Sequence, residues 1–200
     1  MGIGASHQYT RDKRVVVVGG NIAGINAAQE LEKLGFSVTI LEPRNFGWIP
    51  FSAFRASVAS DGDAWAKRMT VPLDRILKRG KFVRGLATGV DKVAKTLSYT
   101  PHEGGEPRSL NYDYLVIATG ARFAAPFNPI GVDAKGARAA LGDLRRCVNG
   151  AKRIIIVGGG PSGIELAGEL RDASDLSEIT ILHSGSTLLS GAGNKAPPAA

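Results

Sequence analysis

Two glycine-rich turns carry the residue types with which proteins bind dinucleotides. The first turn runs Gly19-Gly20-Asn21-Ile22-Ala23-Gly24, and the second runs Gly158-Gly159-Gly160-Pro161-Ser162-Gly163. Backbone N–H groups at the start of a helix, together with the positive end of the helix dipole, bind a pyrophosphate. The last glycine of each turn lets the helix pack close to the preceding strand. We therefore expect one pyrophosphate site at each turn.

Two residues bear on the first of these sites: Glu42 supports nucleotide binding there, and Asn21 departs from the motif. Glu42 follows the second apolar segment, where a carboxylate accepts two hydrogen bonds from the hydroxyls of a ribose. Asn21 stands where the motif usually has its middle glycine. A side chain there narrows the space for the phosphate, although Asn tolerates left-handed backbone conformations better than most residues. We interpret Asn21 as a defect of the motif and expect the substitution Asn21→Gly to keep or tighten binding.

Apolar segments flank both turns in the order strand, helix, strand. Val15 to Val18 are too few for a membrane span and are typical of a strand buried on both faces. The next helix should end at Gly35 and be followed by a strand at 37–41. The second unit should repeat this order with a strand at 153–157, a helix at 164–170 and a strand at 178–182.

The intervening segment predicts a smaller excursion of antiparallel strands. We expect a short amphipathic helix within 63–78, a turn at 101–107, a linker at 123–130, a helix at 141–148, and strands at 82–90, 96–99 and 112–118. The predicted fold class is α/β, with two Rossmann-like units, parallel sheets and a small antiparallel excursion. Two such units imply two different dinucleotides, since each makes one pyrophosphate site. Held together, they indicate electron transfer, most simply from a nicotinamide to a flavin.

An aromatic segment follows Glu42. Phe46, Trp48, Ile49, Phe51 and Phe54 gather there, next to Arg55. One interpretation is simple core packing of the aromatic rings. The other, which their position after Glu42 favours, is a wall beside a flat cofactor ring, with Arg55 reaching a cofactor phosphate or the ring.

Composition limits the remaining classes of function. The chain has 200 residues, of which 44% are hydrophobic and 22% charged, and its net charge is +7. This charge favours anionic partners, but the basic residues lack the interleaved aromatics of a nucleic-acid platform, so we expect no specific nucleic acid partner. Cys147 is the single cysteine, which excludes a disulfide framework, a zinc site and a CxxC redox pair and fits a reducing compartment. No transmembrane helix or secretory segment is expected.

The first residues match a lipidation pattern. Met1 to Ser6 read M-G-x-x-x-S, the pattern for N-myristoylation at Gly2, and Arg11, Lys13 and Arg14 follow. One acyl chain gives only marginal membrane binding on its own. In one interpretation Gly2 is acylated, and the cytoplasmic protein is held peripherally on cytosolic membranes or lipid-droplet surfaces. In the other, the match is due to chance and the first residues are a disordered leader.

Three motifs together resemble one family. VVVVGGNIAG with Glu42, YDYLVIATGA and RIIIVGGGPSGIELAGEL are similar to the two-dinucleotide flavoprotein family of pyridine-nucleotide oxidoreductases. Within it, FRASVAS and ILHS most resemble the apoptosis-inducing-factor-like, ferroptosis-suppressor type of NAD(P)H:quinone reductase. The resemblance implies FAD on the first unit, NAD(P)H on the second, and electron transfer from reduced flavin to a quinone.

The resemblance also implies roles for individual residues. The turn from Gly19 to Gly24 would bind the FAD diphosphate and Glu42 its ribose, and the turn containing Gly158, Gly160 and Gly163 would bind the NAD(P)H phosphates. Other residues are placed near one cofactor: Arg55 at the flavin side, Ala87 at the adenine, Ala118, Thr119 and Gly120 in the ATG element, and Glu165 near the nicotinamide as the candidate catalytic residue.

Departures from the family pattern qualify these roles. No cysteine pair follows Glu42, which excludes the disulfide-reductase branch. His183 stands where an acid would select NADH, so either NADPH is tolerated or His183 is a surface residue with no effect on selectivity. We expect a flexible leader at 1–12, an FAD-binding domain at 13–125, a partial and truncated NAD(P)H-binding domain at 126–184, and a disordered tail at 185–200.

The predicted function is FAD-dependent oxidoreduction, with hydride passing from NAD(P)H to FAD and electrons passing on to a quinone-type acceptor. Its rivals are a non-catalytic nucleotide-binding or interaction protein and a soluble reductase that feeds a protein such as a ferredoxin. We expect the 200 residues alone to bind FAD weakly, to have little activity and to associate through open strand edges.

Overall fold

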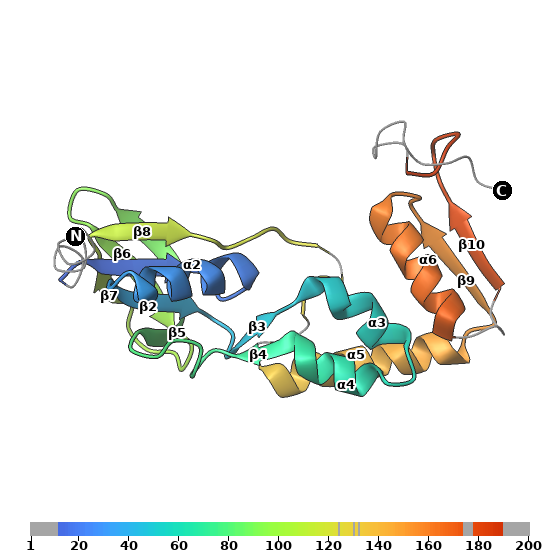
Figure 1. The fold of residues 1–200 in the computed structure, drawn as a ribbon, viewed down its shortest axis with the longest axis horizontal. Coiled ribbons are helices and arrows are strands. Elements are labelled where there is room, and N and C mark those ends of the chain that lie inside the picture. Colours follow the sequence, from blue (N-terminus) through green and yellow to red (C-terminus); the bar gives the residue numbers. More distant parts are fainter. Residues whose placement is uncertain (1–11, 124, 130, 132, 174–177, 190–200) are drawn as a thin grey trace, which may run out of the picture. The chain divides into compact units, whose positions relative to one another are not determined.

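The computed structural model describes residues 12–123, 125–129, 131, 133–173 and 178–189 (Figure 1). These residues fall into two compact units. Unit 1 comprises Met1–Pro50 and Met69–Ala137, and unit 2 comprises Phe51–Arg68 and Arg138–Ala200, each over its described residues. The expected first domain at 13–125 thus differs from unit 1, because residues 51–68 group with the second unit.

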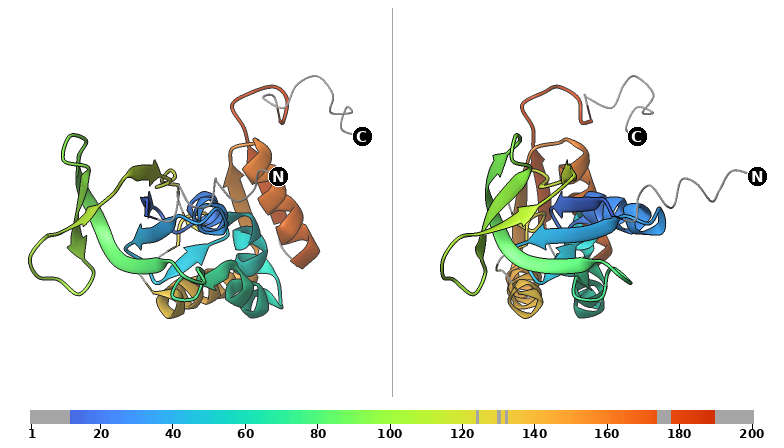
Figure 2. Two further views of the ribbon diagram at one scale, coloured as in Figure 1. Left: turned by 60° about the vertical axis from the view of Figure 1, so that its left-hand side comes forward. Right: turned by 90° about the vertical axis from the view of Figure 1, so that its left-hand side faces the viewer.

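Unit 1 is built on a mixed sheet. In its described part the strand order is β7-β6-β5-β2-β1-β8. The parallel half contains β1 (Arg14–Val18), β2 (Ser37–Glu42), β8 (Tyr114–Ile117) and the start of β5 (Lys81–Asp91). The antiparallel half adds β6 (Thr96–Pro101) and β7 (Arg108–Asn111), and Figure 2 shows the long green strand β5 bending between the halves.

Strand β1 is buried on both faces of this sheet. Val15 and Val17 pack into one apolar cluster with Ala28 of helix α2 (Ile22–Lys33), whereas Val16 and Val18 pack into another cluster on the opposite face. Alternating side chains of a strand point to opposite faces, so four valines fill both clusters. The predicted α/β fold, with a parallel sheet and an antiparallel excursion, is confirmed.

Two of the aromatic residues after Glu42, Phe46 and Trp48, belong to the core of unit 1, whereas Phe51 and Phe54 lie in unit 2 and Phe51 is exposed. Strand β3 (Phe46–Trp48) pairs antiparallel with β4 (Thr70–Pro72). Phe46 and Trp48 are fully buried and meet edge to face, and the indole N–H of Trp48 donates to the Phe127 carbonyl over 2.8 Å. Their burial favours core packing over the expected wall beside a cofactor ring.

Unit 2 holds a smaller parallel sheet. Strands β9 (Arg153–Val157) and β10 (Glu178–Leu182) pair in parallel, and helix α6 (Pro161–Ala173) connects them. One face of the pair packs against α6 through an apolar cluster that includes Ile156 and Leu170. The alternate residues Ile155, Val157 and Leu182 are exposed. Helix α6 therefore covers one face of this strand pair, and apolar side chains are exposed on the other face.

Three further α-helices are α3 (Ala53–Val58), α4 (Gly62–Met69) and α5 (Ala134–Gly150), and a short 3-10 helix, η1 (Pro50–Ser52), precedes α3. The guanidinium of Arg145 on α5 donates to the Ala56 carbonyl over 3.0 Å and pairs with Asp63, so it links three helices of unit 2. The short helix expected within 63–78 is α4, and strand β4 begins directly after it at Thr70. The prediction missed β7, whose four residues carry too little apolar alternation.

A buried carboxylate supports the loop before β5. Glu32 of α2 accepts hydrogen bonds from the backbone N–H groups of Lys78 (3.0 Å), Arg79 (2.6 Å) and Gly80 (2.6 Å). Burial acts to raise the pKa of Glu32, but these donors and the charge of Arg79 outweigh it, so the pKa lies below its ordinary value of 4.5.

We expect the stabilising effect of Glu32 to depend on pH. A carboxyl group whose pKa is lower in the folded state stabilises fully above its unfolded pKa, and this contribution is lost as pH falls through the folded pKa. The difference in unfolding free energy between the wild type and Glu32→Gln should therefore be constant at neutral pH and shrink below about pH 4.5. Urea unfolding between neutral pH and acid measures it. The control is Glu30→Gln, whose carboxylate pairs with Lys33 on the surface of the same helix. An equal pH dependence for both variants would contradict this role.

Candidate functional site

The first turn has a backbone that only glycine permits. Gly19 has φ +115°, and its N–H donates to the Leu41 carbonyl over 2.9 Å. A Cβ at Gly19 would overlap the Ala118 carbonyl oxygen, and a Cβ at Gly24 would overlap the Gly19 carbonyl oxygen. The turn therefore brings the start of α2 against the ends of β1 and β8, as the glycine pattern predicted.

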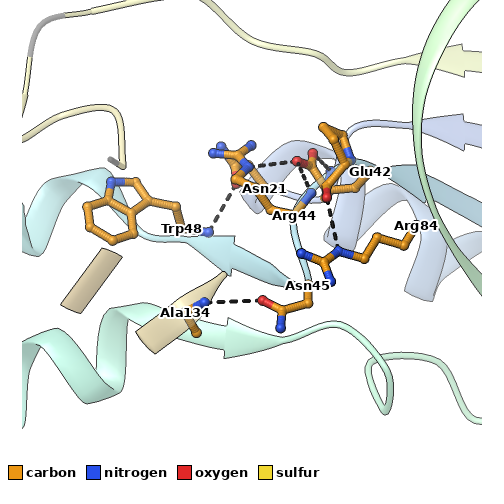
Figure 3. A network of polar contacts seen from close by, with 9 residues as sticks. Asn21, Glu42, Arg44, Asn45, Trp48, Arg84 and Ala134 are labelled. Carbon is orange, nitrogen blue, oxygen red and sulfur yellow. Dashed lines mark hydrogen bonds and ion pairs between the residues drawn. The ribbon is translucent and has the colours of Figure 1, made fainter. Parts of the chain in front are cut away.

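Glu42 is fixed at this turn by its neighbours. Its Oε2 accepts the Gly20 N–H over 2.9 Å, and its Oε1 accepts the Arg44 Nε–H over 2.6 Å (Figure 3). Only 4% of the residue is exposed. Oε1 also accepts the Arg44 backbone N–H over 3.2 Å. An ionised carboxylate has about four acceptor positions, so these three contacts leave about one position for a hydroxyl donor of a ligand.

Asn21 has a structural role that the sequence did not reveal. Its Oδ1 accepts the Trp48 N–H over 3.0 Å, so it joins the first turn to β3 (Figure 3). Asn21 is also the N-cap residue of α2, with φ −101°, and its side chain makes no capping hydrogen bond. The N–H groups in the first turn of α2 therefore keep their capacity to bind an anion.

We accordingly revise the expected effect of Asn21→Gly. The substitution removes the acceptor for the Trp48 N–H and should lower the free energy of unfolding by about 1–3 kcal/mol, the cost of leaving a buried donor without a partner. Asn21→Asp keeps an acceptor oxygen at the same position and should lose less. Chemical denaturation of the three proteins measures the effect. Equal stability of Asn21→Gly and the wild type would show that the Trp48 contact contributes nothing.

A cavity of about 460 Å³ opens at the carboxyl end of the parallel strands in unit 1. Five of its lining residues were predicted site residues: Gly19, Glu42, Ala87, Thr119 and Gly120. Arg44 and Arg122 also line it and were not predicted, because isolated arginines after a strand carry no motif. Turn backbone, carboxylate and two guanidinium groups fit the phosphates and ribose of a dinucleotide.

The second turn repeats the geometry of the first. Gly158 has φ +113°, its N–H donates to the Leu182 carbonyl over 2.8 Å, and a Cβ at Gly163 would overlap the Gly158 carbonyl oxygen. The Gly159 N–H donates to the Nδ1 of His183 over 3.2 Å. Beyond β10, the Leu189 N–H donates to the Gly159 carbonyl over 2.9 Å. The expected disordered tail from residue 185 thus begins with a segment that contacts the turn.

Arg55 and Glu165 both lie in unit 2. The Nε–H of Arg55 on α3 donates to Glu169 Oε1 over 3.0 Å, and its guanidinium lies 3.6 Å from the carboxylate of Asp172. The hydrogen bond that Arg55 donates to Glu169 raises the pKa of Arg55. Glu165 is exposed on α6, one turn before Glu169. The placement of Arg55 near the flavin and of Glu165 near the nicotinamide stays a prediction.

Comparisons with known proteins agree with this arrangement. Residues 13–199 match the family described as pyridine nucleotide-disulphide oxidoreductase. Apoptosis-inducing factor homolog B of Dictyostelium discoideum is 34% identical over 88% of this chain and 45% of its own length. Human ferroptosis suppressor protein 1 is 31% identical over 85% of this chain and 43% of its own length. The chain therefore spans less than half the length of these relatives.

A solved structure shows the same fold. NDH2 from Plasmodium falciparum in complex with NADH superposes with a TM-score of 0.64 at 22% identity, over 90% of this chain and 43% of that protein. At this identity the similarity shows only a shared fold. The inference about the site rests on the geometry of the two glycine turns.

Proposed function

The chain belongs to the pyridine nucleotide-disulphide oxidoreductase family, and on this premise we propose that its first turn holds FAD and its second turn holds NAD(P)H. The observation that carries this proposal is the repetition of one backbone geometry at two turns. Gly19 and Gly158 have φ values of +115° and +113°, and each donates its N–H to the end of the neighbouring strand. One chain thus offers two pyrophosphate sites, each at a helix start.

The protein's part in this function is to bind and orient. The N–H groups at the start of α2, which no Asn21 side-chain cap occupies, receive the FAD diphosphate, and the Glu42 carboxylate accepts a hydroxyl of its ribose. Arg44 holds Glu42 in place through the 2.6 Å hydrogen bond and adds positive charge to the cavity wall. When bound, the two cofactors supply hydride and electron transfer.

We propose a quinone-like small molecule as the electron acceptor. Its support is the resemblance of the FRASVAS and ILHS segments to the ferroptosis-suppressor type of reductase. The alternative is a non-catalytic nucleotide-binding or interaction protein derived from such an enzyme.

Flavin binding and turnover test the proposal. The 200-residue chain should bind FAD weakly, so binding is measured at equilibrium, by dialysis against FAD followed through its absorbance at about 450 nm. NAD(P)H oxidation is then followed with a soluble quinone and, in parallel, with a ferredoxin. Turnover with the quinone supports the proposed acceptor, and turnover with the ferredoxin alone would replace it. Bound flavin without turnover would favour the non-catalytic alternative, and failure to bind FAD would overturn the proposal.

We also propose peripheral contact with cytosolic membranes through an acylated Gly2, which lies outside the described residues. The support is the M-G-x-x-x-S pattern followed by basic residues, since one acyl chain and a basic segment together give stable binding. None of the described helices is long and apolar enough to cross a bilayer. In eukaryotic cells Gly2→Ala should move the membrane-bound fraction to the cytosol. Equal membrane fractions for both proteins would remove the proposal.

A further inference from the structure

We propose that Arg55 is a positioning residue for the pyridine nucleotide, because it fixes helix α6, whose start forms the second turn. The inference rests on the proposed function of that turn and adds a residue that lies outside both glycine motifs. It follows from the contacts that join α3 to α6, and both helices belong to unit 2.

Arg55 pairs with two carboxylates of α6. Its Nε lies 3.0 Å from Oε1 and 2.8 Å from Oε2 of Glu169, and its Nη2 lies 3.6 Å from Oδ2 of Asp172. The side chain of Glu169 is 19% exposed, whereas that of Asp172 is 75% exposed. A shielded carboxylate that loses its cation keeps an uncompensated charge, which is costly. Glu169 therefore ties α6 to Arg55, and the pair with Asp172 adds little.

A contact with α4 also holds the guanidinium of Arg55 in place. Its Cζ lies 6.0 Å from the ring centroid of Trp65, whose indole N–H donates to Asp61 over 3.1 Å. Arg68 lies over the same ring, with its Cζ 5.4 Å from the centroid. The side chain of Arg55 thus bridges α4 and α6, and contacts at both ends fix its direction.

Apolar packing joins α3 and α6 as well. Val58, the last residue of α3, is fully buried and belongs to one cluster with Ile156 of β9 and Leu170 of α6. Leu170 follows Glu169 directly in the sequence, so the ion pair and the apolar contact hold neighbouring positions of α6. Helix α3 therefore contacts α6 through both charged and apolar side chains.

The direction of α6 decides where the second turn presents its N–H groups. Close packing of Gly163 against the Gly158 carbonyl oxygen fixes the start of the helix. Glu169 lies six residues further on, about 9 Å along the axis at the rise of an α-helix. Arg55 thus fixes α6 at a second point. Without it, α6 can tilt on its apolar packing, and a tilt turns the N–H groups away from a bound pyrophosphate.

Equilibrium titration of NAD⁺ into the 200-residue chain tests the inference. Arg55→Met and Glu169→Met each remove the ion pair and should raise the dissociation constant about fivefold, the size of a coupling within one ion-pair network. The two substitutions change the net charge in opposite directions, so equal losses identify position and not charge as the cause. The double variant should lose no more than either single one, and the reversed pair, Arg55→Glu with Glu169→Arg, should recover affinity. Each variant is titrated at a temperature where circular dichroism shows it fully folded, because a purely structural pair would then leave the affinity unchanged.

The control is Arg146→Met, which removes an ion pair with Asp143 on the exposed surface of α5 in the same unit and should leave NAD⁺ binding unchanged. FAD is titrated in parallel, and Arg55→Met should bind it as the wild type does. An unchanged NAD⁺ affinity in Arg55→Met, opposite effects of Arg55→Met and Glu169→Met, or a loss of FAD affinity in place of NAD⁺ affinity would overturn the inference alone. A wild type that binds no NAD⁺ would overturn the proposed function with it.

Discussion

Replacing Gly163 by alanine is expected to abolish pyridine-nucleotide binding at the second turn. The new methyl group would overlap the Gly158 carbonyl oxygen, a backbone atom that cannot rotate away. The helix start must then move from the strand end, which removes the alignment of N–H groups that binds the pyrophosphate. Such overpacking costs about 1–3 kcal/mol or more. Urea unfolding and titration with NAD⁺ and NADP⁺ measure the two effects.

Gly168 on the same helix provides the matched control. It is exposed, and a Cβ there would meet no atom within 4 Å among the described residues. Alanine is the better helix former by about 1 kcal/mol, so Gly168→Ala should be neutral or stabilising. Nucleotide binding should be unchanged. If Gly163→Ala and Gly168→Ala behaved alike, close packing at the turn would not be the reason for Gly163.

The buried strands and the two turns were predictable because their signals are local. Val15 to Val18 follow polar residues and end at the first glycine turn. Several apolar residues in a row predict a strand that is buried on both faces. Strands β7 and β4 were not predictable in this way. Each pairs with a strand elsewhere in the sequence, β7 with β6 and β4 with β3.

The site residues were predictable where a local backbone conformation or a sequence position requires one type of residue. Gly19 and Gly24 follow from the motif, and Glu42 follows from its place after β2. The role of Asn21 was not predictable, because its partner is a backbone N–H at Trp48 that only the fold brings near. Arg55 shows the same limit, since its contacts with Glu169 join helices more than a hundred residues apart.

The substitution Glu42→Ala is expected to have the largest effect on FAD binding. It removes the acceptor of the Gly20 N–H and the partner of the Arg44 guanidinium, together with the proposed contact with the FAD ribose. A hydrogen bond to a charged group contributes about 1.5–3 kcal/mol, so FAD affinity should fall by at least about tenfold. Retention of FAD at gel filtration and titration of the apoprotein with FAD measure the loss.

The variant Glu42→Gln separates the ribose contact from the support of the turn. Its amide oxygen still accepts the Gly20 N–H, so stability should lie nearer to the wild type than in Glu42→Ala. The amide keeps a single acceptor oxygen and carries no charge, so it cannot accept the N–H groups of the turn and a ribose hydroxyl as the carboxylate does. Flavin affinity should therefore fall in both variants, while the free energy of unfolding falls mainly in Glu42→Ala. A Glu42→Gln protein with wild-type flavin affinity would assign Glu42 to the turn alone and remove it from the ribose.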